Sequence, residues 1–252
     1  MIDIFQTTGL TISDWSLFVV CGLLIGMSKA GISGVGLMVV PLMAGIFGGR
    51  PSVGILLPML IIADIFAVIY YNRHAQWRYV LMAMPWAILG VIVATIFGKN
   101  INDDQFNIVL AVTILSGIVL LVWQDVKQKK IHVPDKWWFA ALLGLAGGFT
   151  TMVGNAAGPV MALYLLSMRL PKNNYIGTAA WFFFIINILK VPFHIYSWGT
   201  ITLSSIKLDL FVAPSIILGV FIGIKIVKLF PEKAYRIFII ATTILSAVFL
   251  FK

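Results

Sequence analysis

The stretch Gly26-Met27-Ser28-Lys29-Ala30-Gly31-Ile32-Ser33-Gly34-Val35-Gly36 interrupts an apolar run that extends over residues 14–49. A second interruption, GGFTTMVGNAAGP at residues 147–159, divides the apolar run 137–169. Each run is too long for one crossing, and its arms of about 13–15 residues are shorter than the roughly 20 that a bilayer requires. Non-helical backbone at this depth is tolerated only where it is buried in protein or lines a cavity. The sequence therefore predicts two broken, re-entrant helical hairpins whose tips meet inside the membrane.

The composition excludes a soluble domain. Hydrophobic residues make up 61% of the chain and charged residues 11%, whereas soluble domains carry roughly 25% charged residues. Since lipid offers no hydrogen bonds, apolar runs of this kind must be helical. Six further runs of about transmembrane length lie at 52–72, 76–98, 104–123, 174–196, 205–227 and 233–251. We therefore expect an all-α polytopic membrane protein with eight to ten helices, according to whether the hairpin arms span the membrane.

The two halves of the chain carry related patterns. Gly22 matches Gly144, Gly26 matches Gly148, Asp64 matches Asn187, and Gly90 matches Gly219. The matches keep their order with slowly drifting offsets, which indicates a duplication. We expect one transmembrane domain, residues 1–252, with a first repeat over about 14–125 and a second over about 137–251.

The positions of Lys and Arg predict the orientation. If each interrupted run crossed the membrane once, the basic residues would divide evenly between the two sides. If each run returns to its own side, most of them gather on one side, which the positive-inside rule assigns to the cytoplasm. The other side then keeps Arg50, Lys99, Lys207 and Lys252. Both termini are thus expected outside the cytoplasm, and three crossings per half make the repeats inverted. The net charge of +9 indicates this orientation rather than a nucleic-acid partner.

The two hairpin tips hold the candidate substrate-binding residues. Lys29 lies within an apolar stretch, where an unpaired ammonium is costly. The second arm of each hairpin begins near Gly36 or Pro159, and its N-terminus attracts anions. Together these features predict a site for a small oxyanion, against the alternative that Lys29 pairs structurally with Asp64. The candidates are Ser28, Lys29, Gly31, Ser33 and Gly34 of the first tip, and Thr150, Thr151, Gly154 and Asn155 of the second.

Three further polar residues are expected to face the same cavity. Asp64 is the acidic residue expected within the membrane, and it acts either as a proton carrier or as a fixed counter-ion of Lys29 or Lys190. Asn187 occupies its matched position in the second half. Lys190 lies one turn later, where it either contacts the substrate or pairs with Asp64.

Rival interpretations concern other classes of protein. Gly31-Ile32-Ser33-Gly34 resembles the G-x-S-G motif of rhomboid-type intramembrane proteases, whose serine needs a histidine, and His194 is the candidate. The repeat places Asn155 opposite Ser33, which favours a two-fold binding site over a catalytic serine. A cation channel would require acidic linings. A membrane protein that does not transport a solute, such as an assembly factor, is an alternative that stays open. For His194, a structural position at the end of a helix is the alternative to a functional role. For Trp181, packing in the core is the alternative to lining a cavity. The lone cysteine and the lack of paired Cys/His motifs predict no metal site.

The chain resembles the TauE/SafE sulfite exporter family, also called the toluene sulfonate uptake permease family. The resemblance rests on the run from Gly22 to Gly31, on Gly34-Val35-Gly36 and Pro41, on Gly90 and Gly219, and on Gly144 to Pro159. It implies a bacterial inner-membrane permease, without a cofactor or enzymatic activity, that moves sulfite or an organosulfonate such as sulfoacetate. The expected partners are the small anion and the lipid bilayer. Another small organic anion as substrate and a homodimer both stay open.

Overall fold

The computed structural model describes residues 10–32, 34–106, 108–109, 112, 137–231 and 234, and the helices in this part of the chain are joined by short loops. The first half contains the hairpin arms α2 (Ile12–Lys29) and α3 (Val35–Phe47), followed by α4 (Gly49–Tyr71) and α5 (Trp77–Lys99). The second contains the arms α7 (Trp137–Gly154) and α8 (Gly158–Ser167), followed by α9 (Lys172–Pro192) and α10 (Leu203–Leu229). A 3-10 turn, Asn72–His74, extends α4, and a π-helical turn, Phe193–Ser197, extends α9.

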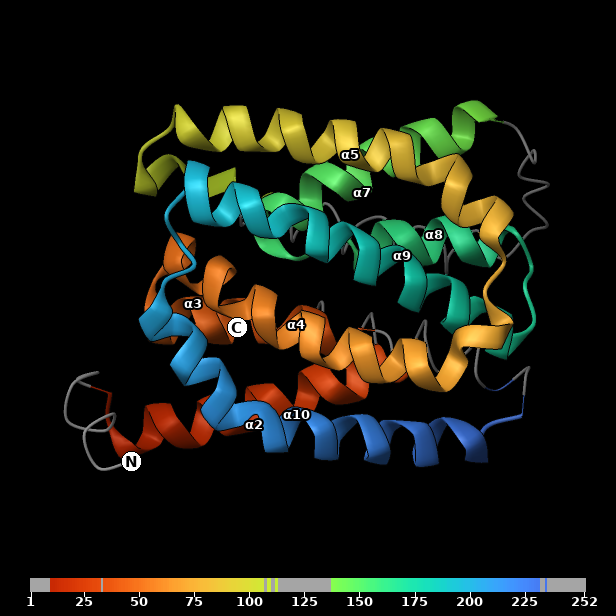
Figure 1. Cartoon of the computed structure of the whole chain (residues 1–252), viewed down its shortest axis with the longest axis horizontal. Coiled ribbons are helices and arrows are strands. Elements are labelled where there is room, and N and C mark those ends of the chain that lie inside the picture. Colours follow the sequence, from red (N-terminus) through yellow and green to blue (C-terminus); the bar gives the residue numbers. More distant parts are fainter. Residues whose placement is uncertain are drawn as a thin grey trace.

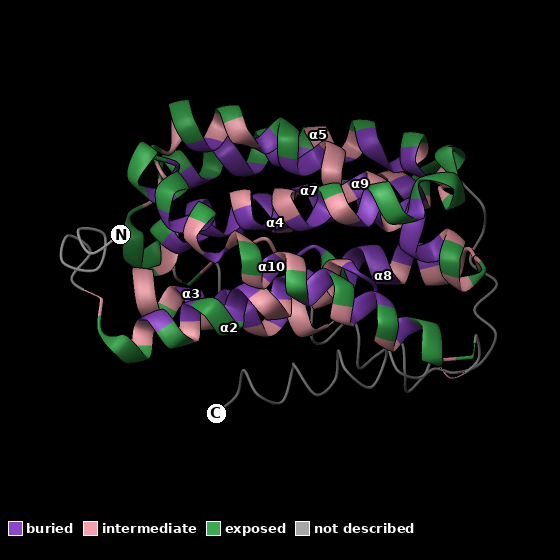
Figure 2. Ribbon diagram, turned by 60° about the horizontal axis from the view of Figure 1, so that its bottom comes forward, coloured by how far each residue is buried: buried purple, intermediate pink, exposed green. Residues whose placement is uncertain are grey.

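The helices lie side by side in a bundle (Figure 1). The pair α5 and α7 packs on one side, the pair α2 and α10 on the other, and α4 packs against α9 between them. Each outer pair joins a helix of one half to a helix of the other half. Buried residues lie on the helix faces that are turned toward one another, and exposed residues lie on the outer faces (Figure 2). Many of those exposed side chains are large and apolar, including Ile69, Leu81 and Leu142, so the outer surface suits lipid.

Six of these helices are long and apolar enough to cross a membrane. Four of them, α4, α5, α9 and α10, confirm the spans predicted at 52–72, 76–98, 174–196 and 205–227. The runs predicted at 104–123 and 233–251 lie mostly or entirely outside the described residues. The other two long helices are the first arms α2 and α7.

The predicted arm length of about 13–15 residues holds for α3 and is wrong for the other three hairpin arms. The first arms α2 and α7 have 18 residues each, while α3 has 13 and α8 has 10. A helix of 18 residues is about 27 Å long and approaches the thickness of the hydrocarbon core. The sequence-based estimate counted Gly26 and Gly148 as helix breakers, but both lie within helices because they are packing positions. A Cβ on Gly26 would overlap the backbone of Ile216 in α10, and a Cβ on Gly148 would overlap that of Ala87 in α5.

The helices are interrupted after Lys29 and after Gly154. Gly34 precedes α3 with φ of 98°, a conformation that glycine adopts at little cost. Asn155 follows α7 with φ of 51°, and asparagine is among the residues that tolerate this region best. These residues therefore turn the chain back at the depth where the two hairpins meet.

Candidate functional site

A cavity of about 100 Å³ lies between the two hairpin tips. Residues of both helix breaks line it, together with side chains from α4 and α9. The polar lining comes from Ser28, Lys29, Thr151, Asn155 and Asn187, and the apolar lining includes Leu56, Leu60, Met161, Leu165 and Phe183. The structure thus brings the two interrupted segments together, as their composition predicts.

Two helix N-termini open onto this cavity. Gly34 and Gly36 line it at the start of α3, and Ala156, Gly158 and Pro159 line it at the start of α8. Neither helix has a side-chain hydrogen bond at its N-cap. The first backbone N–H groups of a helix have no partner within the helix, and the helix dipole adds partial positive charge there. Both ends therefore favour a negatively charged group in the cavity.

Lys29 is held by an acidic partner. Its Nζ lies 2.9 Å from Oδ1 of Asp64 and 4.3 Å from the ring centroid of Phe183. Asn187 Nδ2 donates a hydrogen bond of 2.6 Å to Oδ2 of the same carboxylate. Asp64 is fully buried and does not line the cavity, whereas Lys29 does. The pairing expected from the sequence is therefore formed, and it balances the charge of Lys29 while its side chain still faces the cavity.

One acceptor atom beside the cavity has no hydrogen-bond partner. Asn187 must turn its Nδ2 toward the carboxylate of Asp64, because a carboxylate only accepts. Its Oδ1 is buried and has no hydrogen-bond partner among the described residues. Buried polar groups in proteins are normally satisfied, and Asn187 is a lining residue. A ligand that carries an O–H or N–H group would supply the missing donor.

Lys190 lies behind the cavity wall. Its side chain is fully buried and is not part of the lining. Its Nζ donates to the carbonyl oxygen and Oγ1 of Thr151, both at 2.9 Å, and to Oδ1 of Asn155 at 2.7 Å. The ion pairs in the described part of the chain do not include it. The expected pair between Lys190 and Asp64 is not formed within the described residues, and the expected substrate contact of Lys190 stays a prediction.

The remaining predicted site residues divide into two groups. Gly31 and Gly34 line the cavity with Ser28. Thr150 donates to the carbonyl of Gly147 at 3.2 Å, and Gly154 is buried at the end of α7, and neither is a lining residue. Ser33 lies outside the described residues, so its place in the site stays a prediction.

His194 and Trp181 take part in packing. His194 lies beyond α9, where its Nδ1 is 2.8 Å from Oγ1 of Thr200 and its ring meets Trp198 edge-on. It does not line the cavity. Trp181 packs against Trp77 and Phe184, which agrees with the packing role expected for it.

Sequence reasoning missed two sets of residues. Ile176, Ala180 and Phe183 line the cavity from the same face of α9 as the predicted residue Asn187, and their helical spacing around Asn187 was the available signal. Asp209 in α10 is only 1% exposed, and neither carboxylate oxygen has a hydrogen-bond partner in the part of the chain that the structure describes. Residue 209 lies inside the predicted span 205–227. The expectation that Asp64 is the single acidic residue within the membrane is therefore wrong.

This fold and cavity define a multi-pass α-helical membrane protein with a polar site enclosed between two broken hairpins. The family model for sulfite exporter TauE/SafE matches residues 18–250, and the chain belongs to this family. Its members are membrane transporters and not enzymes, which removes the protease interpretation. Neither the search among curated proteins nor the search among solved structures gave a match.

Proposed function

We propose that this chain is a secondary transporter for a small sulfur-containing anion, either sulfite or an organosulfonate such as sulfoacetate. The observation that carries the proposal is the meeting of two uncapped helix N-termini and Lys29 at one cavity between the hairpin tips. Converging amides and a cation in a low-dielectric setting bind an oxyanion without a metal or cofactor.

The lining of the cavity bears on the substrate. Its volume of about 100 Å³ suits a small anion. Leu56, Leu60 and Phe183 give it an apolar wall opposite the polar tips, so a short carbon chain next to the anionic group would be buried favourably. Another small organic anion, such as a short carboxylate, is the alternative substrate. A carboxylate presents two oxygens to the site, whereas a sulfonate presents three. A competition experiment between a carboxylate and a sulfonate for the same site therefore distinguishes the two substrate classes.

Several contacts support an inverted repeat. Asp64 and Asn187, which occupy matched positions, are hydrogen-bonded to each other. Gly54 at the start of α4 approaches Thr200 beyond α9, and Gly177 at the start of α9 approaches Tyr71 at the end of α4. Matched helices thus run in opposite directions beside each other, as the colours of Figure 1 allow the reader to follow. Inverted repeats of this type place the substrate near the bilayer midplane, between broken helices.

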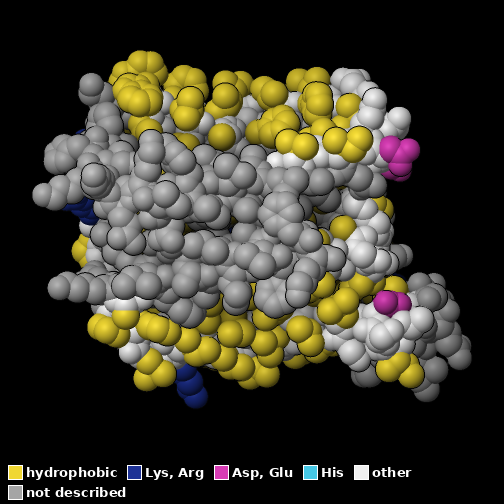
Figure 3. Space-filling view, turned by 180° about the vertical axis from the view of Figure 1, so that it is seen from behind, with side chains coloured by type: hydrophobic (Ala, Val, Ile, Leu, Met, Phe, Trp, Pro, Cys, Tyr) yellow, Lys and Arg dark blue, Asp and Glu magenta, His cyan; other side chains and the backbone are white. Residues whose placement is uncertain are grey.

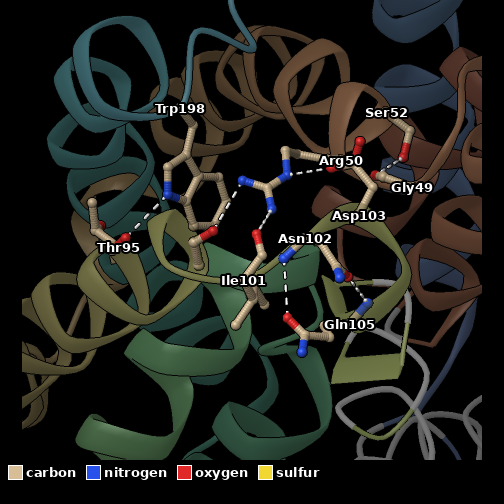
Figure 4. A network of polar contacts seen from close by, with 10 residues as sticks. Gly49, Arg50, Ser52, Thr95, Ile101, Asn102, Asp103, Gln105 and Trp198 are labelled. Atoms are coloured by element: carbon tan, nitrogen blue, oxygen red, sulfur yellow. Dashed lines mark hydrogen bonds and ion pairs between the residues drawn. The ribbon is translucent and has the colours of Figure 1, made fainter.

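A pair of helix caps also repeats between the halves. Arg50, at the start of α4, donates to the carbonyls of Gly98 and Ile101 at the end of α5, both at 2.9 Å (Figure 4). Lys172, at the start of α9, donates to the carbonyls of Val227 and Phe230 at the end of α10, at 3.2 and 2.7 Å. The sequence separation between Gly98 and Val227 equals that between Ile101 and Phe230. The matched pair Gly90 and Gly219 has the same separation, so the two caps occupy matched positions in the two halves.

The Arg50 cap joins several elements at one end of the bundle. Asp103 forms an ion pair of 2.9 Å with Nε of Arg50, and Trp198 donates to the carbonyl of Thr95 at 3.1 Å beside it (Figure 4). The guanidinium also lies 4.7 Å from the ring centroid of Phe106. In the proposed transport cycle the two caps close opposite ends of the bundle, and the hairpins move against the remaining helices to expose the cavity to each side in turn.

The membrane potential sets the direction in which an uncoupled anion moves. A potential that is negative inside favours efflux of an anion by about 2.3 kcal/mol per charge for each 100 mV. Export therefore needs no coupled ion, whereas import does. Asp64 is our candidate for a proton carrier in the second case, because it lies directly behind Lys29 and Asn187.

The charge distribution supports a bacterial inner-membrane orientation with both termini in the periplasm. The described end of the bundle that holds the starts of α2 and α4 carries the acidic residues Asp14, Asp103 and Asp104 together with the basic residues Arg50, Lys99 and Lys207. The opposite end carries basic residues: Arg73, Arg78, Arg169, Lys172, Lys225 and Lys228. Figure 3 shows acidic side chains at one end and basic ones toward the other, with a hydrophobic band between them. The basic end is the expected cytoplasmic side.

Binding by the purified protein tests this function. We expect sulfite, sulfoacetate or methanesulfonate to raise the melting temperature of the detergent-solubilised protein in a concentration-dependent way, and acetate to do so less. The matched control is Lys29→Met with Asp64→Asn, which removes both charges of the pair, so that neither is left without its partner. This variant should fold and lose the stabilisation. If no anion of this panel stabilises the wild type, the proposed function is wrong.

A further inference from the structure

The three hydrogen bonds of Lys190 use the full donor capacity of an ammonium group. Two of its acceptors belong to Thr151 and the third is Oδ1 of Asn155. Lys190 projects from α9, whereas both partners belong to the tip of the second hairpin. The ammonium therefore joins α9 to the tip at the end of α7, where the last carbonyls of a helix attract a cation.

These bonds fix the polarity of the two side chains that reach the cavity. A lysine ammonium only donates, so Thr151 Oγ1 accepts from it and keeps its own hydroxyl hydrogen. Within the described residues, that hydroxyl is not the donor of any other hydrogen bond. Asn155 is oriented in the same manner: its Oδ1 faces Lys190 and its Nδ2 donates to the carbonyl of Val53 at 3.0 Å. Since Thr151 lines the cavity, its hydroxyl is available as a donor to an anion.

We infer that Lys190 is a positioning residue that acts on the substrate through Thr151. It turns the Thr151 hydroxyl into a donor directed at the anion and fixes the Asn155 amide, without touching the substrate itself. This inference rests on the proposed anion-binding function and adds a residue that the cavity lining does not include. A hydrogen bond from Lys190 also polarises the hydroxyl, which strengthens its donation to a negative acceptor.

The first half of the chain places its cation differently. Thr151 occupies the position in the second repeat that Lys29 occupies in the first, 122 residues earlier. Lys29 faces the cavity with its own ammonium, and its partner Asp64 lies behind it. In the second half Thr151 lines the cavity, and the ammonium that donates to its hydroxyl is not part of the lining. Both tips thus present a donor to the same small space, one directly and one through a relay.

A double-mutant cycle tests the inference with Thr151→Val, Lys190→Met and their combination. Affinities for sulfite and methanesulfonate are measured by calorimetry on detergent-solubilised protein. Loss of a hydrogen bond to a charged group corresponds to about a 10- to 100-fold loss of affinity. We expect each single variant to lose at least about 10-fold. In the Thr151→Val background, Lys190→Met should cost less than about 3-fold, because the relay is already broken. Equal losses in both backgrounds would overturn the inference.

Transport kinetics distinguish positioning from a general structural role. In proteoliposomes we expect Lys190→Met to raise KM for the bound anion by at least about 10-fold, while the maximal rate per inserted protein changes by less than about 3-fold. A fall in maximal rate with an unchanged KM would contradict the inference.

Two conservative variants keep the inference testable if Lys190→Met does not fold. Thr151→Ser retains the hydroxyl and should bind within about 3-fold of wild type, whereas Thr151→Val should not. Equal binding by these two variants would overturn the inference. The proposed function fails separately, if the wild type binds none of the sulfur anions or carboxylates. If the wild type binds an anion and substitution of Thr151 does not change the affinity, the inference about Lys190 and Thr151 is wrong, but the proposed function stands.

Discussion

Removal of the Lys29 side chain should destabilise the protein by leaving Asp64 alone. Asp64 is fully buried, and its carboxylate has two contacts, Lys29 at 2.9 Å and Asn187 at 2.6 Å. Breaking a buried ion pair by removing one partner costs about 3–5 kcal/mol. The bond from Asn187 remains, so we expect the lower end, about 3 kcal/mol. For a chain of this length that corresponds to a fall in melting temperature of roughly 6–12 °C.

A second variant separates the pair from the rest of the site. Lys29→Met with Asp64→Asn removes both charges and lets residue 64 accept from Asn187 as an amide. Replacing a whole buried pair is often neutral, so the double variant should melt within about 3 °C of wild type. The assay is the thermal unfolding of detergent-solubilised protein at neutral pH without ligand. If Lys29→Met and the double variant melt at the same temperature, Asp64 does not depend on Lys29 and the reasoning is refuted.

Three other changes test the packing, the cap and the orientation. Gly26→Ala should destabilise the protein by about 1–3 kcal/mol, since its Cβ would overlap the backbone of α10. A Cβ at Gly45 meets nothing within 4 Å, so the melting temperature of Gly45→Ala should not fall. Arg50→Met should lower the melting temperature by roughly 3–8 °C through the loss of two carbonyl caps, whereas Asp103→Asn should change stability by less than about 1 kcal/mol because its side chain is 81% exposed; equal effects would contradict this assignment. Lys99→Cys should react with a membrane-impermeant thiol reagent added outside intact cells, while the native cysteine is buried and should remain silent; labelling only after lysis would reverse the orientation.

The existence of the two broken hairpins was predictable because polar and glycine-rich runs inside apolar segments are rare and costly. Lys29 and Asn155 stand out in such runs, and both line the cavity. The lengths of the arms were not predictable in the same way. Whether Gly26 ends a helix or lies against a neighbouring one depends on the position of α10, and a single sequence does not contain that distance.

The directions of individual side chains were also beyond the sequence. Lys190 follows Asn187 by about one helical turn, so a shared cavity was the natural expectation. The structure turns its ammonium to the hairpin tip and leaves Asn187 at the cavity. Asp209 was missed for a different reason, because one acidic residue near the start of a long apolar run changes the mean hydropathy little. Its unpartnered carboxylate becomes visible only when its neighbours are known.

The hydrogen bond between Asp64 and Asn187 has an evolutionary consequence. Under the proposed duplication, these matched residues face each other across the axis that relates the halves, so an ancestor assembled from two identical chains would have had the same residue on both sides. Two aspartates there would have repelled each other or shared a proton, and two asparagines would have left Lys29 without its counter-charge. Joining the halves in one chain allowed the pair to differ, because a single chain can carry an acid on one side of such an axis and an amide on the other.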